Sequence, residues 1–304
     1  MSTLAIYPGP VGDVVLAVPA LRALKAESPA ERLLLAAQPG VGSLLTALGT
    51  VDGALSFDGL GLHTLFVEDG SPPSHDAVRS ARRIVCWFAS RDVAFARRLQ
   101  ALAPGAIVAS PTGDGAIPVW RHLLASVHAD SPASPPACDP SPAARRAGHQ
   151  ALMRAGWRED TRLVIAHPGA GSLDKRWPAD GFVQVLAPLC AREELTIVLH
   201  EGPADGDAVA AIDSCLAGRA RVLRGLSLVE LAGALVQATA YLGNDSGVSH
   251  LAAAVGLPAV ILFEERRVAW RPWSASADVV FVDTASVGKA DVTAVADRLA
   301  RLLA

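Results

Sequence analysis

The second half of the chain opens with the stretch LVIAHPGAGSLDKRWP, residues 163–178. Its first four residues are apolar, and such a continuous apolar run is typical of a parallel strand that is buried on both faces. A glycine-rich turn follows directly, and a helical pattern starts near residue 179. Because strand, turn and helix repeat in parallel α/β folds, this stretch predicts an α/β fold.

The same alternation of strand and helix patterns continues along the chain in both directions. Apolar runs predict strands at Leu4–Tyr7, Leu33–Ala37, Ala54–Phe57, Ile84–Phe88, Ala106–Ala109, Leu163–Ala166, Thr196–Leu199, Arg221–Leu223, Ala240–Gly243, Ala259–Phe263 and Val279–Val282. Longer patterns predict helices at about 13–27, 41–49, 92–102, 118–128, 143–157, 179–193, 205–217, 227–237, 247–255 and 291–303. A length of 304 residues suggests two domains, each with a parallel sheet covered by helices on both faces.

A proline-rich segment marks the boundary between the two predicted domains. Residues 131–142 contain five prolines, which exclude a helix interior or a central strand. They predict the linker between an N-terminal domain of residues 1–130 and a C-terminal domain that starts at residue 143. The stretch from Gly59 to Arg79 is weakly patterned and predicts a mobile or substrate-facing loop.

The composition narrows the classes of function. The net charge of -3 and the pI of about 6.2 argue against a nucleic-acid-binding protein, which usually has an excess of basic residues. No apolar run approaches the ~20 residues of a membrane span, and the start of the chain lacks the basic region of a signal peptide. We therefore expect a cytoplasmic protein. Four cysteines without a C-x-x-C pair indicate neither a zinc site nor a dithiol motif.

The turn after the first predicted strand, PGPVGD at residues 8–13, carries a carboxylate at Asp13. Gly9 and Gly12 permit a close approach to the backbone, but their spacing does not match the G-x-G-x-x-G dinucleotide fingerprint. A carboxylate repels a phosphate, whereas it is suited to act as a base toward a hydroxyl group. The alternative is that Asp13 caps the helix that follows.

The turn after Ala166 has the composition of a diphosphate site. Its glycines expose backbone N–H groups, Ser172 adds a hydroxyl group, and Lys175 supplies a positive charge. The turn lacks the G-K-[ST] ending of a P-loop, which argues against an NTPase. The alternative is a basic surface loop anchored by Trp177.

A third turn, GNDSGVSH at residues 243–250, ends a strand and begins a helix. The unpaired N–H groups of a helix start form an anion site, and the small residues Ser246 and Gly247 let a phosphate come close. Asp245 is placed to orient a hydroxyl group of a sugar or ribose. His250 lies about one turn into the helix, where it either faces the ligand or packs in the core.

The pair Asp205 and Asp207 matches the D-x-D pattern, which can hold Mg²⁺ against a diphosphate. The pair also starts a predicted helix, where acidic residues stabilise the helix dipole. We favour this second interpretation and expect no metal site.

Together the three turns resemble glycosyltransferase family 9, the ADP-heptose:lipopolysaccharide heptosyltransferases. Residues 11–24 are similar to the family's G-D-x-x-x-x-x-P-A-L element, residues 167–178 to its P-G-[SA]-x-x-x-K-x-W-P element, and residues 243–254 to its N-D-S-G-x-x-H-x-A-A element. Gly256-Leu257-Pro258 and Trp270-Arg271-Pro272 continue the third element. The elements occur in the family's order and spacing, and residues 55–135 carry little of the resemblance.

The resemblance implies a GT-B architecture, in which two Rossmann-like domains face each other across a cleft. The C-terminal domain, residues 143–290, then binds the nucleotide-sugar, the N-terminal domain binds the acceptor, and the last helix, residues 291–304, packs back on the N-terminal domain. The implied reaction is inverting transfer of heptose or a related sugar from an ADP-linked donor to a glycan or lipopolysaccharide inner-core acceptor, without an essential metal or other cofactor. A glycolipid acceptor implies peripheral contact with the cytoplasmic face of the inner membrane.

The resemblance also assigns roles to individual residues. Asp13 becomes the general base on the acceptor hydroxyl group. Lys175 and the helix start at Ser246 and Gly247 stabilise the departing diphosphate, which places positive charge where negative charge develops. The other residues expected to contact the donor are Gly12, Ser172, Asp205 (on the ribose), Asp245 and His250.

The chain departs from the family pattern in the loop Pro8-Gly9-Pro10-Val11, where many members carry serines, in its short N-terminal domain, and at residues 263–267. The chain reads Phe263-Glu264-Glu265-Arg266-Arg267 where members often carry a Gly-Pro-Thr turn. Glu264 and Glu265 place two negative charges near the expected nucleotide, which keeps a non-catalytic sugar-nucleotide-binding protein open as an alternative. A GT-B-like nucleotide-sugar epimerase or hydrolase is a second alternative, with His250 and Asp13 available as its acid and base.

A cluster of arginines in the N-terminal domain has two interpretations. It either meets an anionic acceptor or lipid surface or belongs to ordinary solvated helix faces. Its members are Arg79, Arg82, Arg83, Arg91, Arg97 and Arg98.

Overall fold

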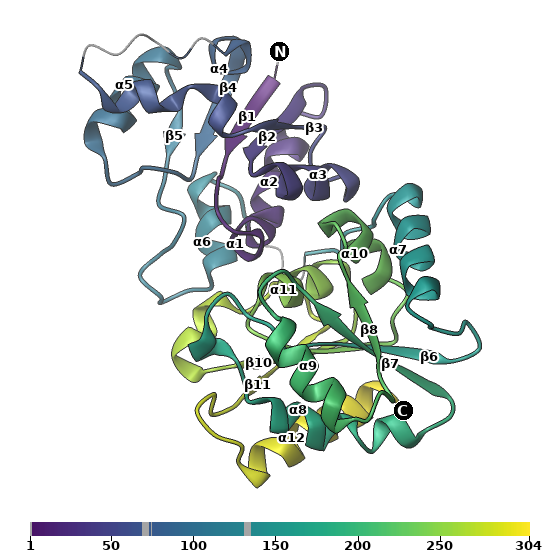
Figure 1. The fold of residues 1–304 in the computed structure, drawn as a ribbon. Helices are drawn as coiled ribbons and strands as arrows, with labels where there is room; N and C mark the ends of the chain where they lie inside the picture. Colours follow the sequence, from purple (N-terminus) through teal and green to yellow (C-terminus); the bar gives the residue numbers. More distant parts are fainter. Residues whose placement is uncertain (1, 69–72, 74, 131–134) are drawn as a thin grey trace. The chain divides into compact units, whose positions relative to one another are not determined.

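The computed structural model describes residues 2–68, 73, 75–130 and 135–304. The chain forms two compact units, residues 1–133 and 134–304, each with its own parallel sheet (Figure 1). Their boundary falls inside the proline-rich stretch predicted as the linker, and residues 131–134 of that stretch lie outside the described part. All eleven predicted strands overlap strands of the structure, so the α/β prediction is confirmed.

Unit 1 contains a five-stranded sheet in the order β3-β2-β1-β4-β5, with parallel pairing throughout. The strands are β1 (Ser2–Ile6), β2 (Arg32–Ala37), β3 (Gly53–Ser56), β4 (Ala81–Cys86) and β5 (Ile107–Val108). The helices are α1 (Val11–Leu16), α2 (Val18–Glu27), α3 (Pro39–Ala47), α4 (Asp76–Ser80), α5 (Val93–Leu102), α6 (Val119–Ser126) and the short 3₁₀ helices η1 (Asp58–Leu60) and η2 (Leu62–Phe66). Leu4, Ala5 and Ile6 are fully buried, as expected of a central strand with helices packed on both faces of its sheet.

Two predictions for unit 1 were wrong in detail. The single helix predicted at about 13–27 is divided into α1 and α2, because Pro19 lies in the first turn of α2. A proline has no N–H group and its ring clashes with the carbonyl of the preceding turn, so it starts a helix and does not continue one. The stretch Gly59–Arg79, predicted as a mobile or substrate-facing loop, is not a continuous loop, because it contains η2 and most of α4, while its residues 69–72 and 74 lie outside the described part. That it faces a substrate stays a prediction.

Unit 2 contains a six-stranded parallel sheet in the order β11-β10-β9-β6-β7-β8. The strands are β6 (Arg162–His167), β7 (Leu195–Glu201), β8 (Arg221–Arg224), β9 (Ala240–Asn244), β10 (Ala259–Phe263) and β11 (Ala277–Phe281). The helices are α7 (Pro142–Arg154), α8 (Ala179–Leu186), α9 (Gly206–Cys215), α10 (Leu228–Leu235), α11 (Gly247–Ala254), α12 (Lys289–Leu302) and the 3₁₀ helices η3 (Leu173–Lys175), η4 (Leu189–Ala191) and η5 (Glu265–Trp270). Successive strands run outward from β6 to β8, and the chain then returns to β9 on the other side of β6.

The last helix, α12, packs within unit 2. Its apolar face buries Val295 and Leu299, followed by Leu303, in the core that β9, β10 and α8 also line. The packing of residues 291–304 on the N-terminal domain, which the resemblance implied, stays a prediction.

Candidate functional site

The two turns of unit 2 that carry polar and charged side chains meet at the carboxyl ends of β6 and β9. These strands are neighbours, with His167 paired to Gly243 at their ends. The strand order of the sheet reverses at this point. In open parallel sheets, ligands bind in the crevice outside such a reversal, because the loops that follow the two strands diverge there. The predicted turns at 167–178 and 243–250 therefore belong to one site.

Asn244 fastens the first turn to the end of β9. Its Nδ2 donates to the carbonyl of Pro168 at 2.7 Å, and its Oδ1 accepts from the backbone N–H of Trp177 at 3.1 Å. The Asn244 side chain is fully buried, so both ends of the turn from 168 to 177 are held by one amide. We assigned Asn244 no role from the sequence, although an amide at the end of a buried strand is itself a signal that a neighbouring loop needs a partner.

Lys175, Asp245 and His250 form a charged group at the centre of the site. The Nζ of Lys175 lies 2.9 Å from Oδ2 of Asp245, and the Nε2 of His250 lies 3.6 Å from Oδ1. Burial alone would raise the pKa of Asp245, but the hydrogen bonds and charges of His250 and Lys175 hold this pKa below its ordinary value. Asp245 and His250 are buried, whereas Lys175 is partly exposed, so the cation is the member of the group that solvent can reach.

The start of α11 is rigidly capped. Ser246 is the N-cap, and its hydroxyl accepts from the backbone N–H of Ser249 at 3.2 Å. The Ser249 hydroxyl in turn donates to the carbonyl of Asn244 at 2.5 Å and lies 2.9 Å from the Tyr241 hydroxyl. The first turn of α11, which begins at Gly247, is thus fixed at the end of β9, where a helix start offers N–H groups to an anion.

The Ser172 hydroxyl forms a hydrogen bond within its own turn. It donates to Oδ1 of Asp174, and this hydrogen bond, with that of Arg267, holds the pKa of Asp174 below its ordinary value. The other oxygen of Asp174 lies 2.6 Å from Nη2 of Arg267. The predicted contact between Ser172 and a donor stays a prediction.

Arginines neutralise the acidic residue that departs from the family pattern. Oε2 of Glu264 accepts from Arg266 at 2.7 Å and from Arg267 at 3.1 Å, while Thr284 donates to Oε1 at 3.2 Å. We expected Glu264 and Glu265 to add two negative charges here. The 3₁₀ turn of η5 brings two arginines back onto the Glu264 carboxylate and offsets its charge, and the effect of this segment on the nucleotide stays a prediction.

Asp205 is turned into the protein. Its Oδ1 accepts from Arg176 at 3.1 Å, its Oδ2 accepts from the N–H of Gly202 at 3.2 Å, and Nε2 of His167 lies 3.8 Å away. A Cβ atom on Gly169 would lie 2.2 Å from this carboxylate, so the position tolerates no side chain. Asp205 precedes α9, and the described residues contain no group of three His, Cys, Asp or Glu side chains that could hold a metal ion. Its contact with a ribose stays a prediction.

A buried histidine pair borders Asp205. Nδ1 of His200 lies 3.1 Å from Nδ1 of His167, and both rings are buried at the ends of β7 and β6. Burial lowers the pKa of His200 to about 3, with a further contribution from His167. Burial also lowers the pKa of His167. No pattern in the sequence predicts a role for either residue.

Asp13 and Gly12 lie in unit 1, in the first turn of α1. The N-cap of α1 is Pro10, so the alternative interpretation of Asp13 as the capping residue was wrong. Asp13 is half-buried beside the turn at Gly9, where an added Cβ would lie 2.8 Å from the ring of Tyr7 and 3.4 Å from Cβ of Asp13. Burial raises the pKa of Tyr7, and the charge of Asp13 raises it further.

Comparison with known proteins places the chain in a family. The profile of glycosyltransferase family 9 (heptosyltransferase) matches residues 80–296, which is more than half of the chain. The chain belongs to this family. The matched range includes the turns that meet in unit 2 and leaves out the turn that carries Asp13.

A curated relative is similar to the chain over part of its length. Lipopolysaccharide heptosyltransferase 3 of Escherichia coli K12 is 33% identical over 117 residues, which cover 36% of this chain and 33% of that protein. The match thus spans about a third of the relative's length.

Two solved structures, one of which is described as a glycosyltransferase of family 9, are similar over nearly the whole chain. One, from Veillonella parvula, has a TM-score of 0.80 at 17% identity and covers 99% of this chain and 97% of its own. The other, ADP-heptose lps heptosyltransferase II of E. coli, has a TM-score of 0.76 at 20% identity, covering 100% of this chain and 98% of its own. At these identities the likeness shows the fold, and the predicted GT-B fold is confirmed.

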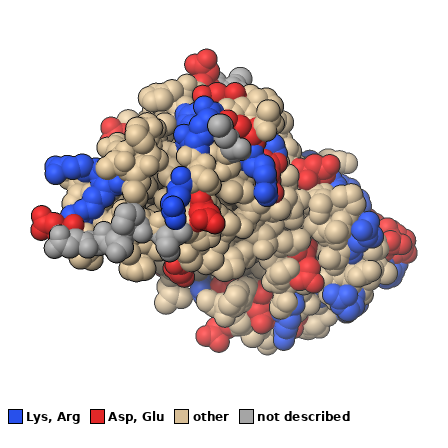
Figure 2. Space-filling view, turned by 90° about the horizontal axis from the view of Figure 1, so that it is seen from above, with Lys and Arg blue, Asp and Glu red and all other residues tan. Residues whose placement is uncertain are grey.

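The surface of the family 9 chain carries mixed charge. Of the arginine cluster, Arg82 pairs with Glu31 and Arg83 with Glu27, both at 2.5 Å, while Arg98 donates to the carbonyl of Leu65. Figure 2 shows Lys and Arg side chains interspersed with Asp and Glu on the face that it presents. Arg82 and Arg83 lie in β4, so for these two residues the interpretation as helix faces was wrong, whereas their ion pairs are typical of an ordinary solvated surface. Among the described residues, no helix is both long and apolar enough to cross a bilayer.

Proposed function

We propose that this chain is an inverting glycosyltransferase that moves heptose or a related sugar from an ADP-linked donor to a glycan or lipopolysaccharide inner-core acceptor. The observation that carries the proposal is the position of Lys175. This cation lies at the reversal point of the unit 2 sheet, held against Asp245 and next to the start of α11, in a chain of family 9.

The donor's diphosphate fits between Lys175 and the first turn of α11. Lys175 supplies a full positive charge, and the N–H groups near Ser246 and Gly247 supply partial ones. Negative charge accumulates on the diphosphate as its bond to the sugar breaks, so cationic groups that are already in place stabilise the transition state more than the ground state. Asp245 and His250 fix the lysine, and Ser172 and Asp205 are the further donor contacts that we propose.

The acceptor half of the reaction is assigned to Asp13. Its carboxylate takes the proton of the acceptor hydroxyl group, the oxygen attacks the anomeric carbon, and the bond between that carbon and the diphosphate breaks, releasing ADP. A single displacement of this kind inverts the anomeric centre. Gly12, in the same turn, is a further donor contact that we propose, because a glycine lets a ligand approach the backbone closely. The proposal assigns no step to a metal ion.

Calorimetric titration with ADP and UDP tests the donor half of the proposal. ADP is expected to bind, UDP to bind poorly, and Lys175→Ala to weaken ADP binding about 10-fold or more, which corresponds to about 1.4 kcal/mol. Lys25→Ala is the matched control, because Lys25 forms a comparable ion pair with Asp52 at 2.6 Å within unit 1. Equal loss of affinity in both variants, or no ADP binding by the wild type, would sink the donor assignment.

Turnover separates the proposal from its alternatives. An ADP-sugar should be consumed only when acceptor is present, and Asp13→Asn should abolish this transfer while leaving ADP affinity within about 2-fold. Consumption of donor without acceptor would indicate a hydrolase or epimerase, and binding without turnover would indicate a sugar-nucleotide-binding protein. Transfer should persist after dialysis against EDTA, and its loss with recovery on added metal would overturn the metal-independent scheme. Sedimentation with vesicles that carry the glycolipid acceptor tests the proposed peripheral membrane contact.

A further inference from the structure

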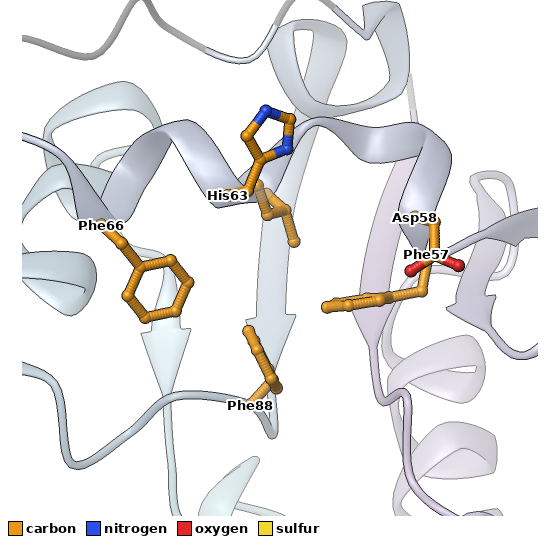
Figure 3. A pocket seen from close by; sticks show the side chains of 6 residues that line it. Phe57, Asp58, His63, Phe66 and Phe88 are labelled. Carbon is orange, nitrogen blue, oxygen red and sulfur yellow. The ribbon is translucent and has the colours of Figure 1, made fainter.

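A pocket that the donor chemistry does not use opens in unit 1 (Figure 3). Its volume is about 240 Å³, and its lining residues are Phe57, Asp58, Leu62, His63, Phe66 and Phe88. Phe57 directly follows β3, and Phe88 lies two residues beyond β4, while η2 supplies the other side. The pocket therefore lies at the carboxyl edge of the unit 1 sheet, the edge at which parallel sheets bind ligands.

The aromatic side chains of this pocket are held in place from behind. The rings of Phe57 and Phe88 meet edge to face at a centroid distance of 4.9 Å, and those of Phe66 and Phe88 do so at 6.2 Å. Phe95, which is fully buried, packs against Phe66 at 4.9 Å and against Phe88 at 5.7 Å. Phe66 nevertheless stays 44% exposed. An aromatic ring that is fixed by its neighbours and open to solvent presents a preorganised apolar face to a ligand.

A second, more polar pocket continues from the first along the same edge. Its volume is about 470 Å³, and Phe57 and Asp58 line both pockets. The rest of its lining comes from the ends of β1, β2 and β3 and consists of Pro8, Ala37, Gln38, Pro39 and Ser56. Gln38 donates to the carbonyl of Pro8 at 3.4 Å, and Pro8 begins the turn that carries Asp13. A ligand that fills both pockets thus extends from the aromatic rings toward the proposed base.

The charge of the lining distinguishes classes of ligand. Among the residues that line the two pockets, Asp58 is the one carboxylate, and Lys and Arg do not occur. The imidazole of His63 points away from the three rings in Figure 3. A phosphate or carboxylate group on the ligand would therefore meet a negative charge and no cation, whereas hydroxyl and ammonium groups can donate to Asp58.

We propose that these two pockets form an acceptor subsite for a sugar without negative charge, either neutral or carrying an amino group. The C–H face of the sugar ring lies on Phe57, Phe66 and Phe88, and its hydroxyl or ammonium group contacts Asp58. An ammonium group gains further from the faces of the aromatic rings. This inference rests on the proposed transferase function and narrows its acceptor, because it disfavours an anionic inner-core sugar at this position. The aromatic pocket is smaller than the roughly 300–1,000 Å³ of drug-sized sites, which fits one sugar ring.

Ligand-observed NMR titration of the full chain tests the subsite directly. The probes are methyl glycosides of a neutral hexose, the matching 2-amino sugar and the matching uronic acid, each in gluco, galacto and manno configuration. In at least one configuration, the neutral and amino glycosides should bind about 10-fold or more tightly than the uronic acid. Phe66→Ala should weaken this binding about 5-fold or more. Phe281→Ala is the matched control, since Phe281 is a phenylalanine of 47% exposure in unit 2. Asp58→Asn should reduce the difference in binding affinity between the amino sugar and the uronic acid.

Three results would overturn the inference. The first is a uronic acid that binds as tightly as the neutral and amino glycosides or more tightly. The second is an equal response of Phe66→Ala and Phe281→Ala, which includes the case in which no glycoside binds either of them or the wild type. The third is Phe66-dependent binding of an octyl glycoside whose matching methyl glycoside does not bind, because the pocket would then take a hydrocarbon chain.

An ADP titration of the same samples separates this inference from the proposed function. If the wild type binds no ADP but still binds the sugar in a way that depends on Phe66, the transferase is refuted and the sugar subsite remains. ADP binding that depends on Lys175, without any effect of Phe66→Ala on sugar binding, would refute the subsite and leave the transferase.

Discussion

The Nζ of Lys175 lies 2.9 Å from Oδ2 of Asp245, and the same carboxylate lies 3.6 Å from His250 through its other oxygen. The cation proposed for the diphosphate is therefore already held by a buried anion before any donor arrives. A carboxylate in this position fixes the lysine and also competes with the phosphate groups for it. The pair is part of the fold as well as part of the site, since a buried carboxylate without its cation is costly.

A double-mutant cycle measures this coupling. Lys175→Ala should lower the free energy of unfolding at neutral pH by about 1 kcal/mol, because it removes the cation that lies 2.9 Å from the buried Asp245 carboxylate. In Asp245→Asn the same lysine substitution should cost much less, which gives a coupling energy of about 1 kcal/mol from urea denaturation of the four proteins. Additive effects would mean that the ion pair contributes nothing to stability.

Two glycines of one turn provide a second test. Gly169→Ala forces a Cβ atom to within 2.2 Å of the Asp205 carboxylate, so Asp205 has to leave Arg176 and the N–H of Gly202. Breaking a buried charge pair typically costs about 3 kcal/mol or more, which should appear as a lower urea midpoint. Gly171→Ala is the control, because its Cβ meets nothing within 4 Å and should change stability by less than about 0.5 kcal/mol. Similar stabilities of the two variants would contradict the close packing of Asp205.

The strands of both units could be predicted from the sequence for a physical reason. Parallel strands with helices on both faces carry uninterrupted apolar residues, and β1, β6, β9 and β10 all do so. Helix ends were less accurate, because the break before α2 depends on one proline within a pattern that is otherwise helical.

The site residues were predictable one by one, but their contacts were not. The glycine-rich turn and the helix start suggested Lys175 and Asp245, whereas their ion pair depends on β6 lying beside β9. A sequence also does not show which way a carboxylate points, so Asp205 could not be distinguished from a ligand-facing residue. The aromatic pocket was even harder to predict from the sequence, since Phe57, Phe66 and Phe88 come from three separate segments.

The segment that departs from the family pattern allows a third prediction. Glu264→Gln should change ADP affinity less than about 3-fold, because Arg266 and Arg267 already neutralise this carboxylate. Arg267→Ala should weaken ADP binding more than Glu264→Gln does, since it exposes the charges of Asp174 and Glu264 to the diphosphate. Calorimetric titration of the two variants gives the comparison. If Glu264→Gln instead tightened ADP binding about 10-fold, the acidic segment would be repelling the nucleotide as the sequence alone suggested.

The buried histidine pair predicts how stability depends on pH. The pKa of His200 falls from an ordinary 6.5 to about 3 in the folded protein, so between these values the unfolded chain binds a proton that the folded chain excludes. Stability therefore decreases as the pH falls below the ordinary pKa. For His200 alone the loss is about 2 kcal/mol between about pH 7 and about pH 5, and His167 adds to it in the same direction.

Urea denaturation at a series of pH values tests this dependence. His200→Gln should flatten the acid side of the stability profile, because glutamine takes up no proton in the unfolded chain. His128→Asn is the control, as His128 is exposed and asparagine tolerates its backbone φ of 61°. An unchanged slope in His200→Gln would mean that the folded protein protonates this ring at its ordinary pKa, and hence that the pair at the ends of β6 and β7 opens to water in mild acid.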